Sequence, residues 1–151
     1  MGYIMELRRL IGTTPIIMVG ACVILTDAKN RLLLQRRTDN GMWGLPGGSL
    51  EPGESLIDVA KRELYEEIGL IANSLTLFDV FSGNEFYYKY PNGDEVHNVV
   101  TAYLCSDYSG TLETDGEEVL ELRFYDLTDI PTEISPPDLP IIRQFLKLAD
   151  R

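Results

Sequence analysis

The sequence predicts an α+β fold with a mixed β-sheet, because strand-like segments dominate and only two segments have a helical pattern. The 151 residues fit one domain spanning 1–151, and the hydrophobic content of 44% is sufficient for a buried core. The formal net charge of −11 disfavours nucleic-acid polymers and anionic membranes as partners. It remains compatible with a small phosphorylated ligand whose charge is screened by cations.

The first strong element is the apolar run PIIMVGACVIL at 15–25, whose β-branched residues predict a central strand buried on both faces. This run is too short to span a membrane, so we expect a cytoplasmic protein without a signal peptide. Cys22 and Cys105 each lie in an apolar run and are expected to be buried free thiols. The turn TDAKN is expected to join 15–25 to a second strand at 31–37 as a hairpin.

The following elements alternate between loops, strands and helices. The glycine-rich segment WGLPGG at 43–48 predicts an irregular loop, and a helix is expected to begin at Ser55 and end at Gly69. Strands are expected in LTLFDVFSG, EFYYKY, EVHNVVTAYLC and LELRFYDL, with PNGD at 91–94 as a hairpin turn. The segment PPDLPIIRQFLKLAD at 136–150 predicts a closing amphipathic helix.

The predicted helix carries three glutamates on one face. Glu63, Glu66 and Glu67 fall within an arc of about 100° and continue its apolar stripe, whereas Arg62 projects to the solvent side. Carboxylates there are partly desolvated, which is costly without a neutralising partner, and few basic residues lie nearby in the sequence. Their oxygen ligands suit Mg²⁺ or Mn²⁺, so the face is a candidate metal site, with a solvated acidic stripe as the alternative. Glu54, eight residues before Arg62, can pair with it and brace the preceding loop.

The segment 48–70 resembles the complete Nudix box. Gly48, five residues, Glu54, seven residues and then RELYEEIGL fill every fixed position of this signature. The surrounding strand pattern is similar to the Nudix αβα sandwich, in which a mixed sheet lies between helices. The resemblance implies a Nudix hydrolase that uses Mg²⁺ or Mn²⁺ to cleave a nucleoside diphosphate linked to another moiety, X.

The resemblance also implies roles for the residues of the box. Glu63, Glu66 and Glu67 would be metal ligands, and the backbone carbonyl of Gly48 often joins them. Metal ions would neutralise the phosphate oxygens and lower the pKa of an attacking water. Arg62, together with its bracing partner, would support the site more than take part in the chemistry.

Residues outside the box supply further candidates. The general base is either a box glutamate or a residue of a later loop, where Glu117 and Glu118 are the candidates and Glu118, next to an apolar run, is preferred. The alternative for both is a solvated acidic loop. Arg36 and Arg37 alternate in direction, so at most one points into the site, and Arg37 matches the usual phosphate-contacting place. Trp43 either stacks on a nucleobase or packs in the core.

The substrate within the class stays open. Nucleotide sugars, ADP-ribose and dinucleoside polyphosphates all fit, and the closest rival is a nucleotide-sanitising (d)NTP pyrophosphatase. A proline that marks many ADP-ribose hydrolases comes late, at Pro91, whereas Tyr87 and Tyr88 match the place of a tyrosine in dinucleoside polyphosphate hydrolases. The alternative from another class is a non-catalytic Nudix-fold nucleotide sensor. Similar proteins are frequently homodimers, which this sequence allows.

Overall fold

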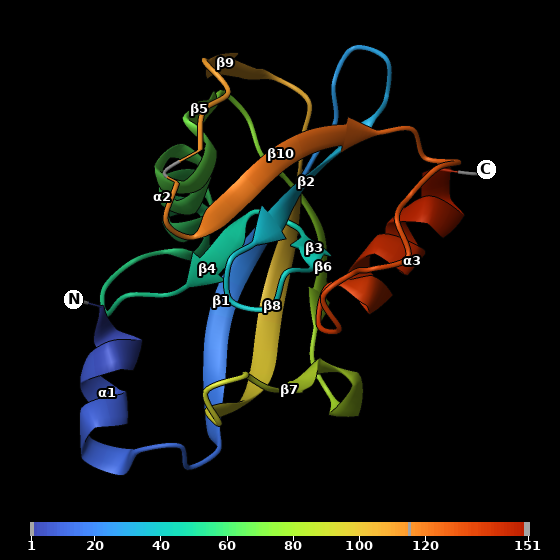
Figure 1. Cartoon of the computed structure of the whole chain (residues 1–151). Helices are drawn as coiled ribbons and strands as arrows, with labels where there is room; N and C mark the ends of the chain where they lie inside the picture. The colour runs from blue at the N-terminus through green and yellow to red at the C-terminus, as the bar shows by residue number, and fades with distance from the viewer. Residues whose placement is uncertain (1, 115, 150–151) are drawn as a thin grey trace.

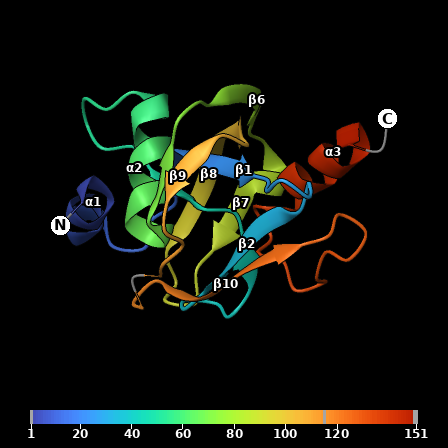
Figure 2. The same ribbon diagram turned by 90° about the horizontal axis from the view of Figure 1, so that it is seen from above.

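The computed structural model describes residues 2–114 and 116–149. Two helices, α2 (Leu56–Ile68) and α3 (Leu139–Ala149), lie on opposite sides of the strands, as Figures 1 and 2 show. This arrangement confirms the predicted αβα sandwich. The expected closing helix begins at Leu139, three residues later than the segment that predicted it. None of the helices within the described residues is long and apolar enough to cross a membrane.

The central sheet is built around two long strands. β1 (Ile16–Leu25) pairs with β8 (Glu95–Cys105) in parallel over its whole length. β4 (Gly47–Ser49) pairs antiparallel with β1, while β6 (Thr76–Phe81) and β7 (Tyr87–Lys89) pair antiparallel with β8. The sheet is therefore mixed, as predicted.

The predicted hairpin between the first two strands is wrong. β2 (Leu32–Arg37) pairs antiparallel with β10 (Val119–Tyr125) and β3 (Trp43–Gly44) in a separate three-stranded sheet. A single bridge between Thr26 and Leu32 is what links β2 to the end of β1. The hydrogen-bonding edges of both strands are taken by other strands, so the short turn between them does not decide their pairing.

Shorter elements complete the chain. β5 (Leu70–Ala72) and β9 (Tyr108–Gly110) form an antiparallel ribbon at the C-terminal end of α2, and the short helix η1 (Asn84–Phe86) leads into β7. The expected PNGD turn is present, because the Tyr90 amide donates to the carbonyl of Asp94 at 2.8 Å between β7 and β8.

Helix α1 (Tyr3–Ile11) corrects the expectation of two helices. It has no buried residue and is held mainly by polar contacts at its ends. The Tyr3 amide donates to Oε2 of Glu51 at 2.9 Å, and Arg8 donates to the carbonyl of Glu95 at 2.7 Å. Its half-buried apolar residues Ile4, Leu7 and Ile11 have helical spacing, so the segment carries an amphipathic pattern that the prediction overlooked.

The core lies on both sides of β1. Val23 and Leu25 pack with α2, whereas Cys22 and Ile24 pack on the side of α3. This alternation follows from the pleat of a strand and confirms burial on both faces for the second half of β1. Cys22 and Cys105 are both buried free thiols, as predicted.

Candidate active site

A cavity of about 660 Å³ opens beside β1, on the side of the sheet that faces α3. One end is acidic and is lined by Glu63, Glu67 and Glu118, with Gly48 beside them. The rest of the lining comes from β2, β7, β8 and the segment before α3, and α1 adds two apolar side chains. The cavity thus joins a cluster of carboxylates to a larger chamber of mixed polarity.

Helix α2 holds the acidic end, and local signals set its length. The hydroxyl of Ser55 accepts a hydrogen bond from the amide of Asp58 at 3.1 Å, which caps the N-terminus. Gly69, with φ of 76°, ends the helix in the left-handed conformation, and its amide donates to the carbonyl of Tyr65. Both predicted helix ends are confirmed.

Glu67 is the most buried of the three box glutamates, with 5% of its surface exposed. It accepts hydrogen bonds from Nε2 of Gln35 and from the amide of Gly47, each at 2.9 Å. Burial raises the pKa of Glu67 to about 8, although these two donors oppose the shift. Burial likewise raises the pKa of Glu63 to about 7, against the effect of a neighbouring guanidinium.

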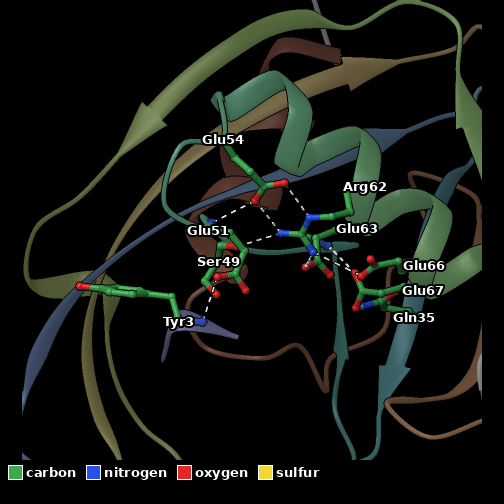
Figure 3. Close-up of polar contacts among 10 residues, drawn as sticks. Tyr3, Gln35, Ser49, Glu51, Glu54, Arg62, Glu63, Glu66 and Glu67 are labelled. Atoms are coloured by element: carbon green, nitrogen blue, oxygen red, sulfur yellow. Dashed lines mark hydrogen bonds and ion pairs between the residues drawn. The ribbon is translucent and has the colours of Figure 1, made fainter. Parts of the chain in front are cut away.

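That guanidinium belongs to Arg62, which joins the loop to the carboxylates (Figure 3). Its Nε and Nη2 atoms contact the two carboxylate oxygens of Glu54 at 2.7 and 2.8 Å, which confirms the predicted bracing pair. Nη1 contacts Oε1 of Glu63 at 2.7 Å and Oε2 of Glu66 at 3.3 Å. The expectation that Arg62 faces solvent away from the glutamates is wrong, because its long side chain folds back over them.

Glu66 also departs from the prediction. Its side chain is 57% exposed, so the inward face consists of Glu63 and Glu67 alone. Helical projection places the three residues within one arc, but Glu66 lies at the margin of that arc, where the loop and sheet no longer cover the helix. It still extends toward Arg62 and Glu63 (Figure 3).

The donor set fits a hard divalent cation, and Arg62 contacts two of its carboxylates. Among the described residues, no three His, Cys, Asp or Glu side chains are grouped closely enough to hold a metal ion. Two carboxylates with raised pKa values nevertheless lie at one end of a cavity, and oxygen donors are the ligands that Mg²⁺ prefers. A Cβ atom on Gly48 would clash with the carboxylate of Glu63, so the glycine allows the backbone to approach this donor.

The two arginines at the end of β2 point in different directions, as predicted. Arg37 lines the cavity, where its Nε and Nη2 atoms contact Asp39 at 2.9 and 2.7 Å. Arg36 instead donates to the carbonyl of Gly41 at 3.1 Å and lies 3.5 Å from Glu121. Of the two arginines, Arg37 is therefore the one that lines the cavity, and its charge is paired with Asp39.

The structure also shows where two other candidate residues, Trp43 and Glu118, lie. Trp43 is 6% exposed and packs edge-on against Tyr125, with ring centroids 5.2 Å apart, so its placement matches the core-packing alternative. Glu118 lines the cavity near Glu63, whereas Glu117 is not part of the lining. The position of Glu118 agrees with the preference for it as a candidate base.

Gln35, Tyr90 and Asp138 line the chamber but were not predicted from the sequence, whereas Tyr88 was already a candidate substrate marker. Asp138 accepts a hydrogen bond from the amide of Leu45 at 3.2 Å, and burial raises its pKa to about 6. Tyr88 and Tyr90 line the same chamber, with their rings edge-to-face at 4.9 Å. Side chains alternate along β2, so Gln35, two residues before Arg37, could have been predicted to face the same side as Arg37. No local pattern identifies Asp138.

The sequence was compared with family models and with known proteins. A family model described as NUDIX domain matches residues 17–145. An ADP-ribose pyrophosphatase of Methanocaldococcus jannaschii is 31% identical over 110 residues, which cover 71% of this chain and 61% of that protein. The 8-oxo-dGDP phosphatase NUDT18 of Homo sapiens is 29% identical over 126 residues, which cover 80% of this chain and 36% of that protein. This chain therefore spans less than two thirds of either relative's length.

Solved structures show the same fold. The crystal structure of a MutT NUDIX hydrolase from Burkholderia pseudomallei superposes with a TM-score of 0.72 and 26% identity, covering 87% of this chain and 98% of that one. The family model spans most of the chain and includes α2 with its preceding glycine-rich loop. The chain belongs to the Nudix family.

Proposed function

We propose that the protein hydrolyses a phosphoanhydride bond in a nucleoside diphosphate linked to another moiety, with Mg²⁺ or Mn²⁺ as cofactor. The observation that carries this proposal is the pair of desolvated carboxylates, Glu63 and Glu67, at the acidic end of a cavity of about 660 Å³. Desolvated carboxylates are costly unless a cation neutralises them. The name of the archaeal relative, an ADP-ribose pyrophosphatase, supports the same class of reaction.

Each residue of the acidic end has a proposed role. Glu63, Glu66, Glu67 and the carbonyl of Gly48 would hold the cation, which when bound neutralises phosphate charge and makes a coordinated water more acidic. Glu118, which lies on the cavity wall, would accept the proton of that water.

Two neighbouring residues support the ligands. Gln35 fixes the direction of the Glu67 carboxylate through its 2.9 Å hydrogen bond. Arg62 holds Glu63 at 2.7 Å and ties the loop to the helix through Glu54. Binding of a cation between the carboxylates would replace part of the neutralisation that Arg62 provides, so we treat Arg62 as a positioning residue.

The remainder of the chamber suits the part of the substrate that carries little charge. Arg37 is paired with Asp39, and the half-buried carboxyl group of Asp138 lies near Arg37, so this end offers no unbalanced positive charge. The phosphates therefore belong at the acidic, cation-binding end. The rings of Tyr88 and Tyr90 offer a surface for a sugar or a base.

A nucleotide-sanitising activity is the second candidate, since the human relative is named an 8-oxo-dGDP phosphatase. A substrate panel separates the candidates. Nucleotide sugars, ADP-ribose, dinucleoside polyphosphates, CDP-alcohols, and ordinary and oxidised (d)NTPs are incubated with Mg²⁺ and then Mn²⁺, and products are identified by ³¹P NMR. We expect cleavage of one class, lost with EDTA and reduced by orders of magnitude in Glu67→Gln. Thermal stabilisation by a nucleotide without turnover of any would contradict the proposal and favour a sensor.

A further inference from the structure

Helix α1 forms part of the chamber wall although none of its residues is buried. Ile4 and Met5, both in its first turn, line the cavity. Ile4 is half-buried, whereas 57% of Met5 is exposed. A long apolar side chain this exposed contributes little to the core. Met5 therefore has contact area left for a molecule that binds in the cavity.

The first turn of α1 is held by the loop that precedes α2. The carboxylate of Glu51 accepts a hydrogen bond from the amide of Tyr3 at 2.9 Å, and a Cβ atom on Gly2 would clash with the same carboxylate. A carboxylate at a helix N-terminus satisfies a free amide and interacts favourably with the helix dipole. Glu51 therefore supplies the cap that Gly2, the N-cap residue of α1, lacks a side chain to provide.

The same loop connects α1 to the acidic end of the cavity. The amide of Glu51 donates to Oε1 of Glu54 at 2.9 Å, and Glu54 contacts Arg62 at 2.7 Å (Figure 3). Arg62 in turn contacts two of the box glutamates. Near the other end of α1, Arg8 donates to the carbonyl of Glu95 on β8 at 2.7 Å. Helix α1 is thus fixed relative to both the carboxylates and the central sheet.

Apolar side chains of the sheet line the cavity together with α1. Met18 of β1 and Val100 of β8 are both part of the lining. They share one face of the sheet, because Met18 lies two residues before Gly20, which pairs with Val100. The thioethers of Met5 and Met18 pack favourably against aromatic rings, whereas the hydroxyls of a sugar require hydrogen-bond partners. This part of the chamber therefore suits a nucleobase better than a sugar.

We propose that the first turn of α1 forms part of a nucleobase subsite, in which Met5 packs against the base and Glu51 holds the turn in place. The inference rests on the proposed function, which places the phosphates at the acidic end. It extends that function by naming the moiety that the apolar wall binds, an aromatic base contacted through the face of its ring. Met5 is then a substrate-contacting residue, and Glu51 is a positioning residue.

The test compares ligands that contain a nucleoside with one that does not. α,β-Methylene-ADP and α,β-methylene-GDP resist hydrolysis, and methylenediphosphonate carries the two phosphonate groups alone. Isothermal titration calorimetry with Mg²⁺ should show that the wild type binds a nucleotide analogue more tightly than methylenediphosphonate. Met5→Ala should raise the dissociation constant of that analogue about fivefold, because a contact of a few apolar atoms is lost, and should change that of methylenediphosphonate less than about twofold.

Leu10→Ala is the matched control. Leu10 is an apolar residue of the same helix that is 83% exposed, and it is not among the described residues that line the cavity, so both affinities should stay unchanged. Glu51→Ala should reproduce the selective loss, whereas Glu51→Gln should retain wild-type affinity, because its amide oxygen still accepts from the amide of Tyr3. Met5 and Leu10 are exposed and alanine favours helices, so we expect both variants to fold, which thermal unfolding checks.

The outcomes separate this inference from the proposed function. Unchanged nucleotide affinity in Met5→Ala, an equal loss in Leu10→Ala, or an equal loss for methylenediphosphonate would overturn the inference without contradicting the proposed function. The same holds if the wild type binds the nucleotide analogues no more tightly than methylenediphosphonate. Equal affinities of Glu51→Ala and Glu51→Gln would overturn the role of Glu51. Failure of all three ligands to bind with Mg²⁺ would contradict the proposed function, and the inference with it.

Discussion

Replacing Glu67 by glutamine should change stability and activity in opposite directions. The carboxyl group of Glu67 is buried in the folded protein with a pKa of about 8, and its ordinary value is 4.5. Between these values the unfolded chain has released the proton while the folded chain retains it. The free energy of unfolding of the metal-free protein therefore falls as the pH rises through this window, by about 5 kcal/mol in total.

Glu67→Gln removes this titration, because an amide stays neutral at every pH. The amide of Gly47 still has an oxygen acceptor in the variant, at the atom that now accepts at 2.9 Å. Oε1 of Gln35 is buried without a hydrogen-bond partner, so rotation of the Gln35 amide lets this oxygen accept from the new side chain. We expect the variant to match the wild type near about pH 5 and to exceed it by a few kcal/mol near about pH 8.

The assay is urea unfolding in EDTA across this pH range, followed by the same series with Mg²⁺. Wild type should regain stability at the upper end of the range when Mg²⁺ is present, because a cation then replaces the proton, and the variant should gain less. Both proteins should also show a weaker fall in the free energy of unfolding with rising pH, which comes from Glu63, whose pKa is raised to about 7. Equal pH dependence of the two proteins in EDTA would refute the reasoning.

Two further predictions follow from the acidic end of the cavity. In Gly48→Ala, the new methyl group meets the carboxylate of Glu63, so the rise in melting temperature caused by Mg²⁺ should shrink; an unchanged rise would contradict the placement of this carboxylate. Glu118→Gln should lower kcat more than Glu117→Gln, because Glu118 lines the cavity, and steady-state rates with the larger loss in Glu117→Gln would argue against Glu118 as the base.

The parts of the site that the sequence predicted are those set by neighbours in the chain. The cap at Ser55 and the left-handed Gly69 act within one turn of the helix ends, so their residue types identify them. The contact between Glu54 and Arg62 is also local in sequence, because only eight residues separate the short loop from this position of the helix that follows it.

The parts that the sequence did not predict depend on distant partners. The turn before β2 forms, with the amide of Asp27 donating to the carbonyl of Arg31 at 3.1 Å, yet the strands on either side enter different sheets. Strand pairing is a property of the whole sheet, which a local turn does not determine. Asp138 reaches the cavity because α3 packs against the sheet, so its position follows from tertiary structure alone.

The parallel pairing of β1 with β8 has a consequence for how the chain folds. Ile16 is paired with Val96, so β1, at the centre of the sheet, can form this parallel pairing only after residues synthesised 80 positions later are available. The contact between Gly20 and Ser49 of β4 closes a much shorter loop and can form early, bringing the glycine-rich segment to β1. On the ribosome, the chain would therefore form the β1–β4 side of the cavity first. The other hydrogen-bonding edge of β1 would stay exposed until β8 is synthesised.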